Sequence, residues 1–522
     1  MTGTVRNPVL PGFHPDPSVC RVGDDHWLVT STFEYFPGLP VHHSTDLARW
    51  EHVGHAIDRR SQLDLDGVKA SGGLFAPTIR HHDGTFWITC TLMHGRTRRG
   101  NFVISATDPS GRWSDPTWLP DAEGIDPSLF FDDDGSAWYV GARATHDPHP
   151  QHPEQTDIWL RRFDVRTRTL VGPEHVLWHG ALRAARWAEG PHLYKVDGRY
   201  VLLVAEGGTE QHHAVTVARA EHVTGPYVGH VDNPVLTHRH LGADHPVVGV
   251  GHADLVEAAD GTWWAFALGM RPVDGHHLLG RETFLVPMRW EDGWPVLAPG
   301  VGQVPAEVTH PAVPDGQTVR PAADAPFVET FTDGLSARWD RLRTAADPAD
   351  TSQPGRLRLP LLPATLADPT TPAFVGLRQQ HHRAVLTARV EAPGLVGHEQ
   401  VGVAVRQNDR HHAVAVLRGS GAERVVEVVL TQDGARERTG RLPLPGDGPV
   451  ELRLTADLLT YTAHARTDDG AWQHVGDVDG RALSTQTAGG FTGVYLGLYA
   501  TSDGHPSDAV AEFVEATYTP GT

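Results

Sequence analysis

Residues 15–31 read PDPSVCRVGDDHWLVTS, and this stretch decides the fold. It begins with a short apolar run, continues through a turn built on Gly and Asp, and ends with a second apolar run that contains Trp27. Two such runs around a tight polar turn are typical of a β-hairpin. The pattern returns four more times before residue 270, so the hairpin is the repeating unit of this half of the chain.

The five copies begin 60, 50, 63 and 63 residues apart, and their first residues are Asp16, Ala76, Asp126, Glu189 and His252. A repeat of this length that contains strands and no helical period predicts a ring of β-sheets. We therefore expect an all-β fold in which residues 1–307 form a five-bladed β-propeller.

The first residue of each copy is expected near the axis of the ring, where three carboxylates and one imidazole would meet. An Asp-Pro-Ser sequence by itself is ordinary turn chemistry. Acidic residues at the same position of separate repeats indicate a functional site, because like charges so close together are costly unless they are used. Asp16, Asp126 and Glu189 are therefore the candidate catalytic residues.

The repeat stops near residue 307. Residues 308–326 are rich in Pro and Ala and lack a period, which predicts a linker. Residues 327–522 contain short apolar runs, such as 385–390 and 401–405, separated by polar segments, and 467–470 has the composition of a hairpin turn. This pattern predicts a β-sandwich, jelly-roll-like, as an accessory domain.

The composition restricts the partners. With 44 basic and 64 acidic residues the formal charge is −20, which disfavours nucleic acid and anionic membrane as partners and leaves homo-oligomerisation open. No apolar run has transmembrane length and the N-terminus lacks the apolar core of a signal peptide, so we expect a cytoplasmic protein. Cys20 and Cys90 lie in apolar runs and are expected to be buried thiols.

The first three hundred residues closely resemble the family 43 glycoside hydrolases, and the rest resembles the β-sandwich of the β-xylosidase and α-L-arabinofuranosidase branch. The motifs that carry the resemblance are NPVLPGFHPDPS at 7–18, FEYFPG at 33–38, GIDPSLF at 124–130, EGPHLY at 189–194, AEGGT at 205–209, GHADLV at 251–256 and LGRETF at 279–284. The resemblance implies the same propeller and sandwich.

Residue by residue, the resemblance implies that Asp16 is the general base, Glu189 the general acid, and Asp126 the carboxylate that orients the acid and tunes its pKa. It implies no cofactor for the chemistry. It does imply a calcium ion in the propeller channel, facing His252 through water. The residues that it places in substrate binding are Phe33, Phe75, Thr209, His252, Arg281 and Phe491.

The implied activity is that of an inverting exo-glycosidase that releases terminal β-D-xylosyl or α-L-arabinofuranosyl units from small oligosaccharides. The alternatives are an endo-arabinanase-like hydrolase, a non-catalytic sugar-binding propeller, and a metallohydrolase, for which no His-Glu-x-x-His motif is present. His14 and residues 210–213 depart from the family pattern. Both are expected near the pocket, so the choice of sugar stays open.

Overall fold

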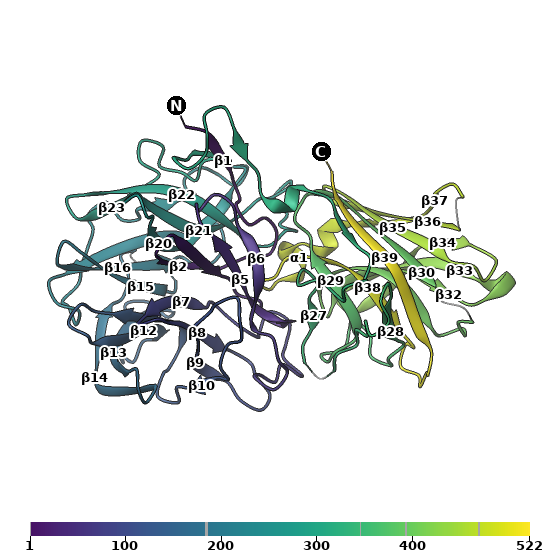
Figure 1. Ribbon diagram of the computed structural model, residues 1–522, viewed down its shortest axis with the longest axis horizontal. Helices are drawn as coiled ribbons and strands as arrows, with labels where there is room; N and C mark the ends of the chain where they lie inside the picture. The colour runs from purple at the N-terminus through teal and green to yellow at the C-terminus, as the bar shows by residue number, and fades with distance from the viewer. Residues whose placement is uncertain (1, 183–185, 345, 392–393, 468–469, 522) are drawn as a thin grey trace.

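The computed structural model describes residues 2–521 except 183–185, 345, 392–393 and 468–469. Two β-rich parts lie side by side: the N-terminal half, purple to teal, and the C-terminal part, green to yellow (Figure 1). The predicted all-β class is confirmed. The hairpin turn predicted at 467–470 includes two residues that lie outside the described ones. None of the described helices has the length and apolar character needed to cross a membrane.

Within the described residues, the N-terminal part contains five antiparallel sheets, each built on four strands that are nearly consecutive in the chain. Each begins with one of the predicted hairpins. The strands are β2 (Ser18–Val22), β3 (Asp25–Val29), β5 (Gly38–Ser44) and β6 (Glu51–Ile57); β7 (Thr78–His82), β8 (Thr85–Leu92), β9 (Gly100–Ala106) and β10 (Thr117–Trp118); β11 (Ile125–Phe131), β12 (Ala137–Ala144), β13 (Thr156–Asp164) and β14 (Thr169–Trp178); β15 (Glu189–Val196), β16 (Arg199–Glu206), β17 (Ala214–Ala220) and β18 (Val228–Gly229), with β19 (Leu236–Thr237) beside β17; and β20 (Val248–Glu257), β21 (Trp263–Met270), β22 (Glu282–Glu291) and β23 (Trp294–Leu297).

The five sheets follow one another around a closed ring. The first strand of each sheet contacts the first strand of the next, in the order β2, β7, β11, β15 and β20, and β20 contacts β2 again. The N-terminal segment fastens the closure. The backbone of Leu10 pairs with that of Thr283, and the Asn7 side chain bonds both backbone groups of Leu285. The start of the chain is thus joined to the last sheet.

Residues 308–326, predicted as a linker, connect the two parts but carry structure of their own. Strands β24 (Glu307–Thr309) and β25 (Thr318–Val319) flank β1 (Thr4–Arg6), and a helical turn, η1 (Ala322–Asp324), follows. Val308 and Val319 are buried in the same core cluster as Val5. Burial of these apolar side chains against the ring holds the Pro-rich segment in a defined conformation.

The C-terminal part is a β-sandwich, as predicted. One sheet contains β26 (Phe327–Glu329), β28 (Leu357–Pro360), β30 (Arg383–Glu391), β35 (Val450–Asp457), β36 (Thr460–Thr467), β37 (Gln473–Asp479) and β39 (Val510–Pro520); the other contains β29 (Ala373–Arg378), β31 (Gln400–Asn408), β32 (His411–Arg418), β33 (Val425–Gln432), β34 (Ala435–Pro443) and β38 (Tyr495–Thr501). Burial alternates along β30, the pattern of a strand with one face on a core. Short helical turns, η2 (Gly421–Glu423), η3 (Gly480–Leu483) and α1 (Thr485–Ala488), complete it.

Two features join the sandwich to the ring. Strand β27 (Arg341–Leu342), which follows β26, pairs with β4 (Tyr35–Phe36) of the ring. Beside this contact lies a cavity of about 430 Å³, lined by residues of both parts and of the connecting segment. His14 lines this junction cavity, whereas the sequence placed it near the hub of the ring.

Four histidines cluster at the junction. Neighbouring ring centroids are 5.3 Å apart for His14 and His42, 5.1 Å for His42 and His52, and 4.6 Å for His52 and His55. Burial, with the positive charge of Arg378, lowers the pKa of each of them, that of His52 to about 4. The folded protein therefore holds these rings in the neutral form.

The first prediction concerns stability at acid pH. In the unfolded chain these histidines take up protons near pH 6.5, whereas in the folded chain they do so only at lower pH. The unfolded state therefore binds more protons below pH 6.5, and the free energy of unfolding falls by up to about 1.4 kcal/mol per pH unit for each histidine as pH drops toward 4. Calorimetric Tm values between pH 7.5 and 4.5 measure this slope.

The variant His42→Phe keeps a ring of similar size and removes one titrating group, so its Tm should depend less steeply on pH. His149, which is exposed, supplies the matched control His149→Phe, whose slope should equal that of the wild type. Equal slopes for all three proteins would contradict the assignment.

Candidate active site

The predicted site residues converge on one pocket at the hub of the ring. The pocket has a volume of about 220 Å³. Its lining includes all nine residues singled out from the sequence: Asp16, Phe33, Phe75, Asp126, Glu189, Thr209, His252, Arg281 and Phe491. Four further residues complete the lining: Ala76 and His213, which were expected near the axis and the pocket, and Ile125 and Trp187, which carried no prediction.

The hub residues lie where the backbone departs from a regular strand. Asp16, Asp126 and His252 have positive φ angles of 55°, 53° and 42°. The pairing register shifts next to Asp126 in β11, next to Glu189 in β15 and next to His252 in β20. Such bulges re-aim a side chain, and Asp and His tolerate the left-handed conformation better than most residues. The irregular strand ends turn these side chains toward the axis.

Asp16 is buried and bound to a cation. Its Oδ1 accepts a hydrogen bond from Nη1 of Arg281 at 2.6 Å, and its Oδ2 accepts one from the Ser31 hydroxyl. Arg281 also donates to Thr209 Oγ1 at 3.2 Å. Arg281 and the Ser31 hydroxyl each bind one oxygen of Asp16, and together they fix the orientation of that carboxylate.

Glu189 lies in a different electrostatic environment, in which burial and negative neighbours outweigh the opposing charge of Arg281. Burial within the pocket, followed by the negative charges of Asp126 and Asp16, raises its pKa well above the ordinary value of a glutamate. Burial also raises the pKa of Asp126, to about 6, with His252 opposing the shift. One pocket thus holds a carboxylate paired with a guanidinium and a carboxyl group whose pKa is raised, which is the unequal pairing that acid–base catalysis needs.

Gly190 brings the remaining hub groups together. Its backbone N–H donates to Asp126 Oδ2 at 3.0 Å. Its φ is +57°, and a Cβ there would lie 2.8 Å from Cε1 of His252. Glycine is therefore needed for the backbone beside Glu189 to pack against His252 while bonding Asp126.

Three phenylalanines form one wall of the pocket. The ring centroids of Phe33 and Phe75 are 5.2 Å apart, and that of Phe491 is 5.9 Å from Phe33. The Arg281 guanidinium lies over the rings of Phe33 and Phe491. Phe491 comes from the C-terminal sandwich, and its backbone N–H donates to Ser71 Oγ of the ring at 2.9 Å. The pocket is therefore built by both parts of the chain.

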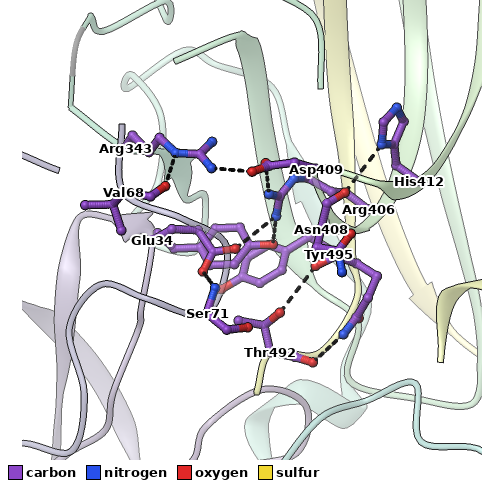
Figure 2. A network of polar contacts seen from close by, with 12 residues as sticks. Glu34, Val68, Ser71, Arg343, Arg406, Asn408, Asp409, His412, Thr492 and Tyr495 are labelled. Atoms are coloured by element: carbon purple, nitrogen blue, oxygen red, sulfur yellow. Dashed lines mark hydrogen bonds and ion pairs between the residues drawn. The ribbon is translucent and has the colours of Figure 1, made fainter. Parts of the chain in front are cut away.

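A buried polar network holds this wall in place (Figure 2). Glu34, next to Phe33, accepts from the Ser71 backbone N–H at 2.8 Å and from Arg406 Nη1 of the sandwich at 3.3 Å. Arg406 also donates to Asp409 at 2.7 Å, and Asp409 accepts from Arg343 at 2.7 Å. Both side chains of the Arg406–Glu34 pair are fully buried. Cations of the sandwich thus fix the segment that receives Phe491.

The next layer along the inner strands is filled by an arginine. Arg80 bonds both carboxylate oxygens of Asp254, at 2.8 and 3.1 Å, and donates to His192 Nδ1 at 3.0 Å. Ser18 and Tyr194 also bond Asp254. Ser18 and Asp254 each lie two residues beyond a hub residue, so this network lies next to the hub along the inner strands.

The same network bears on the calcium ion implied at His252. The His192 ring lies 6.3 Å from the His252 ring. Because Nδ1 of His192 accepts a hydrogen bond from Arg80, the ring proton of His192 is on Nε2, which is buried and unpartnered. The described residues include no group of three or more His, Cys, Asp or Glu that could hold a metal ion. A guanidinium and an N–H donor do not suit a cation that prefers oxygen ligands, so these residues do not fit directly coordinated calcium.

Comparisons with known proteins identify the family. Residues 5–295 match the model of the glycosyl hydrolases family 43, and residues 328–519 match the beta xylosidase C-terminal concanavalin A-like domain. The chain belongs to glycosyl hydrolase family 43 and is a glycoside hydrolase.

Three relatives cover nearly the whole chain. A xylosidase/arabinosidase of Butyrivibrio fibrisolvens is 39% identical over 97% of this chain and 98% of its own length. A non-reducing end alpha-L-arabinofuranosidase of Bacteroides ovatus is 38% identical over 98% of this chain and 94% of its own. The crystal structure of a xylan beta-1,4-xylosidase from Bacillus halodurans superposes with a TM-score of 0.91 at 33% identity, covering 99% of this chain and all of that one.

Of the lining residues without a predicted role, Trp187 is the largest, and its side chain is 40% exposed. The motif at 189–194 begins two residues after it, so reading upstream from Glu189 would have found it. Cys20 and Cys90 are buried free thiols, as expected, and lie outside the pocket lining.

The second prediction concerns the buried ion pair. Arg406→Met leaves Glu34 buried without its cation, which should lower the free energy of unfolding by about 3–5 kcal/mol. It should also lower kcat/KM, because Glu34 orders the segment that binds the Phe491 backbone. Urea denaturation and steady-state kinetics measure the two effects. The control is Arg410→Met, which changes an exposed arginine four residues along and should alter neither quantity appreciably. Wild-type stability in Arg406→Met would refute the role of the pair.

Proposed function

We propose that the protein is an inverting exo-glycosidase that removes terminal β-D-xylosyl or α-L-arabinofuranosyl units from small xylo- and arabino-oligosaccharides. The observation that carries the proposal is the unequal pair in the pocket: Asp16 is bound to Arg281, whereas the pKa of Glu189 is raised. The relatives named for xylosidase and arabinofuranosidase activity support the choice of sugars.

The shape of the pocket supports removal of end units. The site is a pocket of about 220 Å³ rather than a long groove, and Phe491 of the sandwich closes part of one side. A closed pocket admits a chain end and excludes an internal segment, which an endo-acting enzyme would hold in an open groove. We further propose that the five sheets are the blades of a five-bladed propeller, because their first strands form a closed ring around this pocket.

The roles of the carboxyl groups follow from their environments. Glu189 gives its proton to the glycosidic oxygen as the bond to the anomeric carbon breaks, and the leaving unit departs as an alcohol. Asp16, ionised beside Arg281, takes a proton from the water that attacks the opposite face of the sugar. Asp126 keeps Glu189 protonated by its charge and holds the Gly190 backbone. The net negative hub stabilises an oxocarbenium-like transition state.

The other lining residues recognise the terminal sugar. Phe33 and Phe75 offer aromatic surface to the apolar face of the ring, while Arg281 and Thr209 offer hydrogen bonds to hydroxyl groups. His252 packs beside Glu189 and faces the same space. The small substrate needs no organic cofactor for this reaction.

The third prediction separates acid from base. Glu189→Gln should lower kcat on oligosaccharides by about 10²–10⁴-fold and spare aryl glycosides whose leaving group needs no proton. Asp16→Asn should lower kcat on both kinds of substrate, because water must be activated whatever leaves. Steady-state kinetics on xylobiose and on 2,4-dinitrophenyl β-D-xylopyranoside measure this contrast, with the corresponding arabinosides as the second pair. Equal losses for both substrates in Glu189→Gln would overturn the assignment.

The fourth prediction concerns pH and stereochemistry. Activity should fall as pH rises through the pKa of Glu189, because the acid then lacks its proton, and this alkaline limb should vanish in Glu189→Gln assayed on an activated aryl glycoside. Early proton NMR spectra of the wild-type reaction should show inverted product. Retention of configuration would refute the proposed mechanism.

The fifth prediction concerns metal. Since Arg80 supplies a cation in the layer below the hub, dialysis against a chelator should leave kcat/KM unchanged within about twofold, a difference of less than 0.5 kcal/mol in transition-state stabilisation. Assays with added calcium chloride and zinc chloride are the controls. Complete loss of activity that one of these metals restores would show that a metal takes part.

A further inference from the structure

Trp187 is a large apolar side chain exposed at the mouth of the pocket. It is 40% exposed, whereas Phe33, which also lines the pocket, is 2% exposed. A tryptophan left open to water at the rim of a sugar pocket gains free energy when an apolar surface covers it.

Trp187 is tied closely to the proposed acid. Only Ala188 separates it from Glu189, so the two Cα atoms lie within about 7 Å of each other. The group that protonates the glycosidic oxygen is necessarily next to that oxygen in the productive complex. Because Trp187 also lines this pocket, it is the candidate contact for the sugar unit that departs with this oxygen.

The protein holds Trp187 by several contacts. The preceding residue, Arg186, is fixed on two sides. Its side chain forms an ion pair with Glu154 at 2.6 Å, and the Arg186 backbone carbonyl accepts a hydrogen bond from the Gly207 N–H at 2.9 Å. The indole lies against Gly208, where a Cβ would come within 3.0 Å of Cζ3. Trp187 has a φ of 45°, a conformation that costs free energy in a residue other than glycine. The surrounding contacts thus hold Trp187 in a backbone conformation that is unfavourable by itself and that leaves the indole exposed.

The indole and the phenylalanine wall are separate surfaces. Phe33, Phe75 and Phe491 contact one another, while no ring contact joins any of them to Trp187 among the described residues. Within that wall Phe33 is buried, whereas Phe491 is 41% exposed, so the buried part of the wall suits the terminal sugar. Trp187, which lies on the side of Glu189, is then available to contact the next sugar unit, the leaving group.

We infer that Trp187 is the stacking platform for the leaving-group sugar and determines how well the enzyme uses oligosaccharides. The ligand is a pyranose or furanose unit that presents its apolar C–H face to the indole. This inference rests on the proposed exo-glycosidase function.

The test compares two substrates that share the terminal unit and differ in the leaving group. Xylobiose has a sugar as its leaving group, and β-D-xylopyranosyl fluoride has only fluoride. Trp187→Leu should lower kcat/KM for xylobiose by about 5–50-fold, within the range measured when aromatic stacking contacts are removed. The same variant should keep kcat/KM for the fluoride within about threefold. Trp187→Phe, which retains an aromatic face, should recover most of the loss. If wild type prefers arabinose, the arabinobiose and arabinofuranosyl fluoride pair replaces these.

Controls separate the possible failures. Trp472→Ala removes a tryptophan that packs on Arg453 and Arg466 in the sandwich, outside the pocket lining, and should affect neither substrate. Equal effects of Trp187→Leu on the disaccharide and the fluoride, or no effect on the disaccharide, would overturn the inference. A wild type inactive on every one of these compounds would instead refute the proposed function.

Discussion

The structure around the hub depends on the cost of placing three carboxyl groups in one pocket. Like charges in a poorly solvated site repel, and the protein offsets this in two ways. Arg281 binds Asp16 at 2.6 Å, while burial and the negative charges of its neighbours raise the pKa of Glu189 and so favour its uncharged form. The arrangement that lets these carboxyl groups share one pocket thus also gives them the unequal proton affinities that acid–base catalysis requires.

The sandwich contributes to the same site through buried charge. Arg406 reaches Glu34 of the ring, and Glu34 in turn fixes Ser71, which binds the Phe491 backbone. A buried pair is weak evidence for stability, because desolvation opposes the attraction, but it specifies position when every partner is bonded. The two parts of the chain are therefore coupled where the sugar is expected to bind.

The layer below the hub shows how the axis of the ring is filled. Arg80 reaches Asp254 and His192, which lie on β20 and β15, so one side chain satisfies groups from two other sheets. It also supplies positive charge beneath the negative hub. Among the described residues no group of three or more His, Cys, Asp or Glu could hold the calcium ion that the resemblance implies at His252, and the Asp254 carboxylate nearby is bound by Arg80.

The sequence by itself determined the hairpin repeat, the sandwich and the nine residues that meet in the pocket, because strand alternation, turn chemistry and the motifs are local properties. It did not reveal that residues 308–326 pack on β1, that His14 faces the junction cavity, or that Trp187 lines the pocket rim. Those features depend on contacts between segments far apart in the chain. Only the tertiary structure decided which buried groups Arg80, Arg281 and Arg406 neutralise, because an ion pair is set by distance in space and leaves no period in the sequence.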